Sequence, residues 1–163
     1  IFGRGGEEVE HLRAAGIAVT VVNGITAGLA GMTGLGAPLT HRDHAHGVLF
    51  VTGHQHPSDA GTDWRQLAAT ARDARLTLVI YMGVAGCADI QQGLLGGLPA
   101  QTPAVVIQHV SLPRQRHVRT TLGGLQGSIE HAGLASPAVI VVGDVVRGVA
   151  ASNFWVETAC SRC

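Results

Sequence analysis

The residues best suited to chemistry lie in glycine-rich turns. The first turn, Gly3–Glu8 (GRGGEE), leads into a predicted helix, and the backbone N–H groups and dipole at a helix N-terminus favour an anion. The turn is not the G-x-G-x-x-G dinucleotide fingerprint, because Glu8 occupies the position of the last glycine. Glu7 and Glu8 also fit a purely structural role, since acidic side chains stabilise the first turn of a helix.

Two further turns are associated with apolar runs that are typical of strands. Asn23–Gly28 (NGITAG) follows the run Ala18–Val22, and Met82–Val84 closes the run Thr77–Met82. Because ligands of open α/β sheets bind beyond the carboxyl ends of the strands, both turns are candidate ligand sites. Either turn is also explained as a simple connection between a strand and a helix. Met82 is equally suited to be a buried side chain of an apolar core.

Histidines and cysteines are the side chains that would suggest a metal site. Imidazole and carboxylate groups bind zinc, but the spacing of these residues matches no tight zinc pattern. Cys160 and Cys163 form a single C-x-x-C pair without a second pair of ligands. We therefore predict no metal site in this chain. The residues considered are His41, Asp43, His44, His46, His54 and His56.

Composition narrows the class of protein that carries these turns. The 163 residues include 11 Lys+Arg and 11 Asp+Glu, so there is no excess positive charge to attract nucleic acid or an anionic membrane. Hydrophobic residues reach 46% and charged residues only 13%, as in a folded protein with a large core. All cationic side chains are arginine, which excludes lysine chemistry within this chain.

The lengths of the apolar segments and the spacing of the cysteines indicate where in the cell the protein is located. The longest apolar run, Ala138–Ala150, is broken by Asp144 and Arg147, so no segment is long enough to cross a bilayer. There is no leader-like start, and the three cysteines have no disulfide-framework spacing. We expect a soluble, cytoplasmic protein.

Short β-branched runs alternate with amphipathic segments, a pattern that predicts an α/β fold. Arg116–Leu122 alternates in polarity and is expected to be an antiparallel edge strand. The other predicted strands are Ala18–Val22, Val48–Thr52, Thr77–Met82, Ala104–Ile107 and Ala138–Val142. The predicted helices are Glu7–Ala15, Asp63–Arg72, Ala88–Leu95 and Leu125–Ala132, three of which end at Gly16, Gly96 and Gly133.

Several motifs occur in an order that resembles a known family. The sequence is similar to the uroporphyrinogen-III C-methyltransferases of the tetrapyrrole methylase superfamily, which stand alone or form the C-terminal part of sirohaem synthase. The likeness covers nearly the whole chain. The motifs are Ile1–Glu8 (IFGRGGEE), Val21–Gly28 (VVNGITAG), Pro38–Asp43 (PLTHRD), Val51–His54 (VTGH), Thr77–Gly83 (TLVIYMG), Pro113–Arg116 (PRQR) and Val139–Val146 (VIVVGDVV).

The resemblance implies a tetrapyrrole methylase-like fold, with a mixed β-sheet flanked by helices and a cofactor cleft between two α/β domains. Residues 1–36 would be the tail of the N-terminal domain and residues 37–163 the C-terminal domain. The family's first glycine-rich cofactor loop, its acidic and lysine residues proposed for proton transfer, and its GGDP segment have no counterpart in this chain, so the catalytic residues are expected outside it. Asn23 also departs from the proline common in the family. A homodimer is implied as well.

The activity that the resemblance implies is transfer of methyl groups from S-adenosylmethionine to two ring carbons of uroporphyrinogen III. The product, precorrin-2, leads to sirohaem and cobalamin. Family contacts to the cofactor fall on Ile1, Thr26, Ala27, Met82 and Val110. Contacts to the tetrapyrrole fall on Arg4, Glu7, Arg42 and again Met82. Arginine offers a planar, permanently charged fork to the substrate carboxylates, and Glu7 can accept from pyrrole N–H groups.

Two alternatives remain open. A sister methylase acting on a later corrin intermediate would share the cofactor turns, although Arg4, Glu7 and Pro38–Asp43 favour the uroporphyrinogen branch. A truncated, non-catalytic dimerisation domain would use the same strands only to build a core. Saturable binding of S-adenosylmethionine or its demethylated product separates this last alternative from the enzymes.

Overall fold

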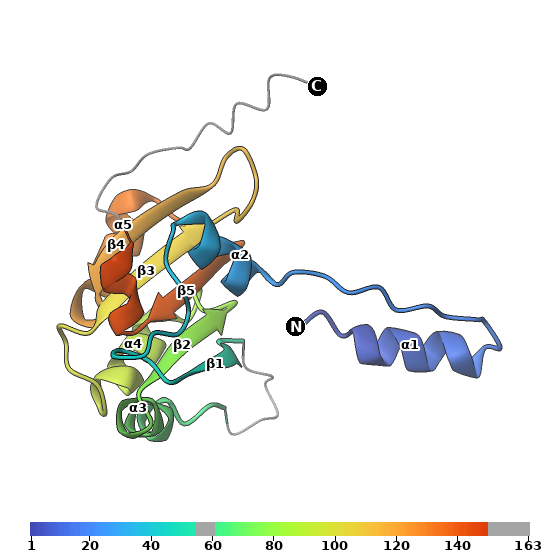
Figure 1. The fold of residues 1–163 in the computed structure, drawn as a ribbon, viewed down its shortest axis with the longest axis horizontal. Helices are drawn as coiled ribbons and strands as arrows, with labels where there is room; N and C mark the ends of the chain where they lie inside the picture. The colour runs from blue at the N-terminus through green and yellow to red at the C-terminus, as the bar shows by residue number, and fades with distance from the viewer. Residues whose placement is uncertain (55–60, 150–163) are drawn as a thin grey trace.

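One mixed sheet organises the chain, of which the computed structural model describes residues 1–54 and 61–149. The five strands lie in the order β1-β2-β5-β3-β4 (Figure 1). Their bounds are β1 Gly47–Thr52, β2 Leu76–Tyr81, β3 Pro103–Gln108, β4 Arg116–Thr121 and β5 Ala138–Val142. The edge strand β4 pairs antiparallel with β3, as the alternation in Arg116–Leu122 predicts.

Strand direction decides where loops can meet. β1 and β2 are parallel, whereas β5 runs antiparallel to both β2 and β3. β1, β2 and β3 therefore point the same way, and the turns after them share one side of the sheet. We call this side, with Gly53, Met82–Gly83 and His109–Ser111, the carboxyl edge. The opposite side, where the segment Thr40–His46 enters β1 and Arg75 enters β2, is the amino edge.

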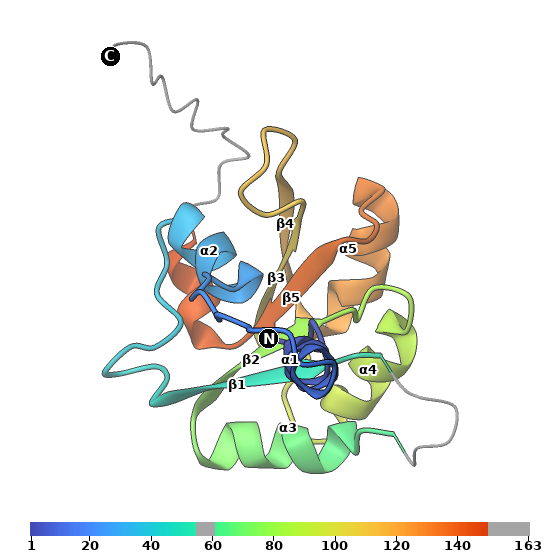
Figure 2. The same cartoon turned by 90° about the vertical axis from the view of Figure 1, so that its right-hand side faces the viewer.

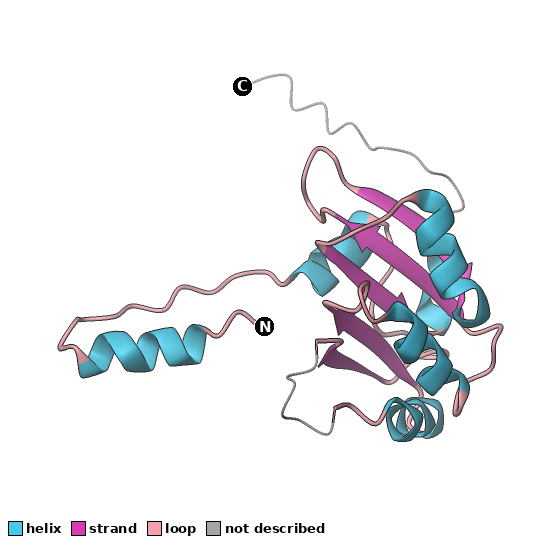
Figure 3. Ribbon diagram, turned by 180° about the vertical axis from the view of Figure 1, so that it is seen from behind, coloured by secondary structure: helices cyan, strands magenta, loops and turns pink. Residues whose placement is uncertain are grey.

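Both faces of the sheet are covered, and the views in Figures 2 and 3 separate the two layers. Along β2, Leu78 and Ile80 face α3, α4 and α5, whereas Val79 faces α2 and η2. This alternation is the two-residue period of a strand with two buried faces. The helices are α2 Ala27–Gly34, α3 Trp64–Asp73, α4 Cys87–Leu95 and α5 Leu125–Ala132, with the 3₁₀ turns η1 Leu122–Gly124 and η2 Asp144–Gly148.

The N-terminal helix stands apart from these layers. α1, Gly5–Ala14, has no buried residue, and an extended linker joins it to α2 (Figure 1). The prediction of a strand at Ala18–Val22 is wrong for this structure. Its backbone makes no hydrogen bond to another described segment, and β-branched residues form a strand only beside a pairing partner. Ile17, Val21, Val22 and Ile25 are consequently exposed, by 51% to 84%.

The remaining predicted elements are confirmed within a few residues at their ends. Gly16 and Gly133 follow α1 and α5 with φ of 74° and 59°, the left-handed conformation that glycine adopts readily, and Gly96 caps α4. α2 belongs to the predicted tail 1–36, yet Met32 of α2 is fully buried against the sheet. The division into domains at residue 36 stays a prediction.

Among residues 1–54 and 61–149, no helix combines the length and the apolar character needed to cross a membrane.

Candidate functional site

The carboxyl edge concentrates unusual backbone conformations. Met82, His109 and Ser111 have φ of 55°, 53° and 63°, which residues with a side chain rarely adopt. Such strain persists where the surrounding structure holds it, and it is concentrated at binding sites. The turn at Met82 and the turn at His109–Ser111 thus have backbone conformations that the local sequence does not favour.

Close backbone packing holds the first two turns of this edge together. The Gly53 N–H donates to the Tyr81 carbonyl at 2.6 Å. A Cβ atom on Gly53 would lie 2.6 Å from the Cα of Gly83, closer than real Cβ contacts permit. Glycine at position 53 therefore lets the turn after β1 approach the turn that contains Met82.

Helix α2 lies over the same edge and is anchored there by Tyr81. The Thr26 and Tyr81 hydroxyl groups share a hydrogen bond at 2.5 Å, and the Gly28 N–H donates to the Tyr81 oxygen at 2.7 Å. One turn along α2, a Cβ atom on Gly31 would lie 3.2 Å from Val110. The predicted cofactor residues Thr26, Ala27, Met82 and Val110 are thereby grouped at one edge.

The N-terminal residues of the chain lie beside the same group of residues at the carboxyl edge. The ring of Phe2 lies 5.3 Å from the ring of Tyr81, centroid to centroid, which places the adjacent Ile1 at the carboxyl edge. Ile1 is 66% exposed and Met82 48% exposed, so both leave apolar surface uncovered at this edge. The Ala27 N–H has no partner among the described residues, and a Cβ atom on Gly24 would meet nothing within 4 Å. These features suit a ligand with an apolar part and an acceptor atom.

Arg4 and Glu7, predicted to contact the tetrapyrrole, form an ion pair with each other. The Arg4 Nε donates to the two carboxylate oxygens of Glu7 at 3.1 and 3.0 Å. This hydrogen bond raises the pKa of Arg4 and lowers that of Glu7, and both side chains are exposed. Arg4 follows Phe2 by two residues, so the pair starts near the carboxyl edge.

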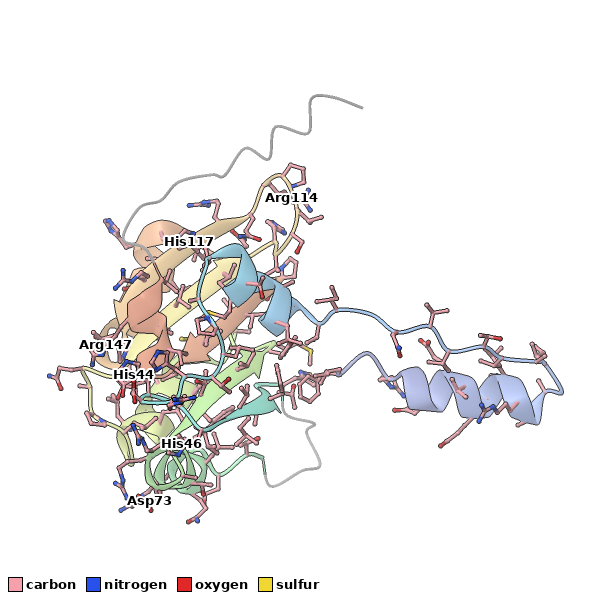
Figure 4. All side chains as sticks on the ribbon, in the orientation of Figure 1. His44, His46, Asp73, Arg114, His117 and Arg147 are labelled. Atoms are coloured by element: carbon pink, nitrogen blue, oxygen red, sulfur yellow. The ribbon has the colours of Figure 1, made fainter. Side chains whose placement is uncertain are left out.

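Arg42 is not brought to this group within the chain. It lies at the amino edge, in an open hollow lined by Thr40, His41, Arg42, Ala45 and His46. The six residues of β1 separate the hollow from the carboxyl edge by about 20 Å, at roughly 3.3 Å per residue. In Figure 4, His44 and His46 lie on the side of the sheet opposite to Arg114, which belongs to the β3–β4 turn. The role of Arg42 stays a prediction.

The histidines of the amino edge form a polar cluster. The rings of His41 and His44 stack at 4.6 Å, and Arg75 donates to the carbonyl of Asp43. Over the described ranges, no three His, Cys, Asp or Glu side chains are grouped as metal ligands. His56, Cys160 and Cys163 lie outside those ranges.

Cys87, at the start of α4, is a buried thiol. Burial raises its pKa to about 11. A thiol needs its deprotonated form to act as a nucleophile, so Cys87 is an inert part of the core.

Tyr81, Phe2 and the strained pair His109 and Ser111 were not predicted from the sequence as parts of the site. One signal was available for Tyr81, because it is the only tyrosine in the sequence and stands at the end of a largely apolar run. A buried phenol normally has a hydrogen-bond partner. The partner, Thr26, is 55 positions away and could not be deduced from local pattern.

The mixed sheet with helices on both faces matches the fold of solved methyltransferase structures. Residues 1–126 match the family model of the tetrapyrrole (corrin/porphyrin) methylases, and the chain belongs to this family. The chain is 47% identical over 160 residues to a uroporphyrinogen-III C-methyltransferase from Pseudomonas fluorescens, covering 98% of this chain and 63% of that protein. It is 45% identical over 148 residues to a siroheme synthase from Stutzerimonas stutzeri, covering 90% of this chain and 31% of that protein.

A solved structure supports the same family. The uroporphyrin-III C-methyl transferase from Thermus thermophilus, complexed with S-adenyl homocysteine, matches with a TM-score of 0.74 at 37% identity. The match covers 91% of this chain and 63% of that chain. The chain thus spans less than two thirds of the length of these methyltransferases.

Proposed function

We propose that this chain takes part in S-adenosylmethionine-dependent C-methylation of uroporphyrinogen III to precorrin-2, on the route to sirohaem and cobalamin. The observation that carries the proposal is the convergence of Ile1, Thr26–Ala27, Met82 and Val110 on one carboxyl edge, from four separate segments. The relatives support it, since the Pseudomonas protein is named for this reaction and the Thermus structure contains S-adenyl homocysteine.

The residues of the carboxyl edge are suited to hold the cofactor, which supplies a methyl group on a sulfonium. The Ala27 N–H and the Thr26 hydroxyl offer polar contacts at the start of α2. Met82 and Ile1 offer exposed apolar surface for the uncharged part of the cofactor. The small side chains of the turn leave room for the ligand to approach the backbone.

Arg4 and Glu7 are proposed to bind the tetrapyrrole. An exposed ion pair contributes little by itself, so Arg4 can exchange Glu7 for a substrate carboxylate. The freed Glu7 carboxylate then accepts from a pyrrole N–H. Arg42 is proposed to bind a substrate carboxylate too, but its position at the amino edge separates it from the other contacts in this chain.

The test of the proposal is calorimetric titration of the chain with S-adenosylhomocysteine. Ala27→Leu adds bulk at the first residue of α2, and we expect at least about tenfold weaker binding because the added atoms occupy ligand space. The control is Ala88→Leu at an exposed alanine in the first turn of α4, which should bind like the unsubstituted chain. Because Ala27 is half-buried against the core, the thermal stability of both variants is measured alongside.

Two outcomes of this titration count against the proposal. Absence of saturable binding to the unsubstituted chain would favour the non-catalytic dimerisation domain. Equal affinity of the Ala27→Leu and Ala88→Leu variants would remove Ala27 from the cofactor site. Competition between uroporphyrinogen III and later corrin intermediates distinguishes the sister methylase.

A second prediction separates substrate residues from cofactor residues. Arg4→Ala and Arg42→Ala should weaken the binding of uroporphyrin III, a stable analogue of the substrate, by about tenfold or more, because each removes a charge partner of a carboxylate. Affinity for S-adenosylhomocysteine should stay within about twofold. Arg13→Ala, which removes an exposed arginine from the same helix as Glu7, is the control. Loss of cofactor binding before tetrapyrrole binding would mean that the roles are misassigned.

The remaining predictions concern assembly and location. We propose a homodimer in the cytoplasm, with no nucleic-acid or membrane partner. The equal numbers of acidic and basic residues and the apolar residues exposed between α1 and α2 support these proposals. Sedimentation of the purified chain measures the oligomeric state.

A further inference from the structure

We propose that Tyr81 is the positioning residue of the cofactor turn, holding the first turn of α2 in its binding conformation through its hydroxyl group. This inference rests on the proposed function, because it assigns how the cofactor contacts Thr26 and Ala27 are held in place. Tyr81 is the last residue of β2 and precedes Met82, so one residue links the strand, the strained turn and the helix.

The start of α2 lacks the capping that its sequence suggests. Thr26 is the N-cap residue, with φ −79° and ψ 147°, and threonine at this position normally accepts from an N–H of the first helical turn. Its side chain makes no such bond. The hydroxyl is turned toward Tyr81, 2.5 Å away.

Tyr81 takes over the missing cap. Its oxygen accepts from the N–H of Gly28, the second residue of α2, at 2.7 Å, which is the bond that an N-cap side chain would make. A residue of the sheet thus caps the helix across the tertiary structure. When the phenol donates to Thr26, the Thr26 proton is left free for an acceptor atom of the ligand.

The packing around the phenol leaves little freedom for this arrangement. The Tyr81 ring contacts Phe2 at 5.3 Å and Phe50 at 6.3 Å, centroid to centroid. A Cβ atom on Gly28 would lie 2.9 Å from the Tyr81 oxygen, so only glycine lets the helix backbone come this close. Phe2 and Phe50 therefore hold the Tyr81 ring, and the Tyr81 hydroxyl group holds the start of α2. Tyr81→Phe removes the hydroxyl and keeps these ring contacts.

The decisive variant is therefore Tyr81→Phe, with Thr77→Val as the matched control. Thr77 lies on the same strand and face as Tyr81, is fully buried, and has no hydrogen-bond partner for its hydroxyl among the described residues. Both variants remove one hydroxyl from β2. Only Tyr81→Phe removes a bond to α2.

Two measurements are made on the complete chain. In amide hydrogen exchange followed by NMR, Gly28 should exchange about tenfold faster in Tyr81→Phe and at an unchanged rate in Thr77→Val. In titration with S-adenosylhomocysteine, Tyr81→Phe should bind about tenfold more weakly. Thr26→Ala should cost less affinity in the Tyr81→Phe background than in the unsubstituted chain, because the two hydroxyl groups act through one hydrogen bond.

The outcomes separate this proposal from the proposed function. Unchanged exchange at Gly28, or unchanged affinity of Tyr81→Phe while the unsubstituted chain binds, overturns the role of Tyr81 alone. Absence of binding to the unsubstituted chain overturns the proposed function and, with it, the link from Tyr81 to the cofactor. Equal effects of Tyr81→Phe and Thr77→Val would mean that the hydroxyl acts only through general stability.

Discussion

The 163-residue chain by itself is expected to form no detectable precorrin-2 from uroporphyrinogen III and S-adenosylmethionine. Methyl transfer is a displacement at carbon, and the main task of a methyltransferase is to hold the methyl donor and the acceptor carbon in line. Such positioning supplies roughly 7 to 11 kcal/mol of the barrier reduction, or a rate factor of at least about 10⁵. In the described part of this chain, α1 has no buried residue and the apolar side chains of the linker to α2 are exposed, so neither segment is packed as a wall beside the carboxyl edge.

The assay mixes the chain with S-adenosylmethionine and freshly reduced uroporphyrinogen III and follows precorrin-2 or its oxidised, coloured derivative. The Pseudomonas fluorescens methyltransferase, of which this chain covers 63%, is the positive control. Turnover in the ordinary range of about 1 to 10³ s⁻¹ would contradict the expectation. It would mean that the residues of this chain complete the site, alone or between two copies.

Gly28→Ala is expected to lower the free energy of unfolding by about 1 to 3 kcal/mol, although alanine is the better helix former. The added Cβ would lie 2.6 Å from Val79, 2.9 Å from the Tyr81 oxygen and 3.2 Å from Phe50. These side chains belong to the sheet surface beneath α2, where packing is tight. The helix must move outward, which also breaks the Gly28–Tyr81 hydrogen bond.

Gly127→Ala is the matched control, because Gly127 lies inside α5 and a Cβ atom there would meet nothing within 4 Å. This variant should raise the free energy of unfolding by up to about 1 kcal/mol through helix propensity alone. Urea denaturation followed by circular dichroism measures both values. A Gly28→Ala variant as stable as Gly127→Ala would mean that α2 is not held against the sheet as the structure has it.

The sequence by itself determined most of the local structure. Apolar runs such as Thr77–Met82 and Ala138–Val142 become strands because a buried sheet needs β-branched side chains on both faces. Amphipathic periodicity located α3, α4 and α5 for a similar reason, since one helix face must be buried, and terminal glycines marked the ends of α4 and α5. These signals depend on neighbours along the chain, so they can be detected without knowledge of the fold.

The same local signals failed where pairing partners decide the outcome. Ala18–Val22 has the composition of a strand, yet its backbone makes no hydrogen bond to another described segment, so it forms no strand. The β-branched residues of a segment favour the extended conformation, but a strand also needs a second segment to pair its backbone hydrogen-bonding groups.

Only the tertiary structure decided which candidate residues meet. Thr26 and Tyr81 are far apart in the sequence, and they come together because β1, β2 and β3 point the same way and α2 crosses their carboxyl ends. The same strand directions place Arg42 at the other edge. Strand order and direction arise from long-range packing of faces that look alike in sequence. The family resemblance therefore implied the candidate residues, whereas composition and spacing did not determine which of them lie at one edge of the sheet.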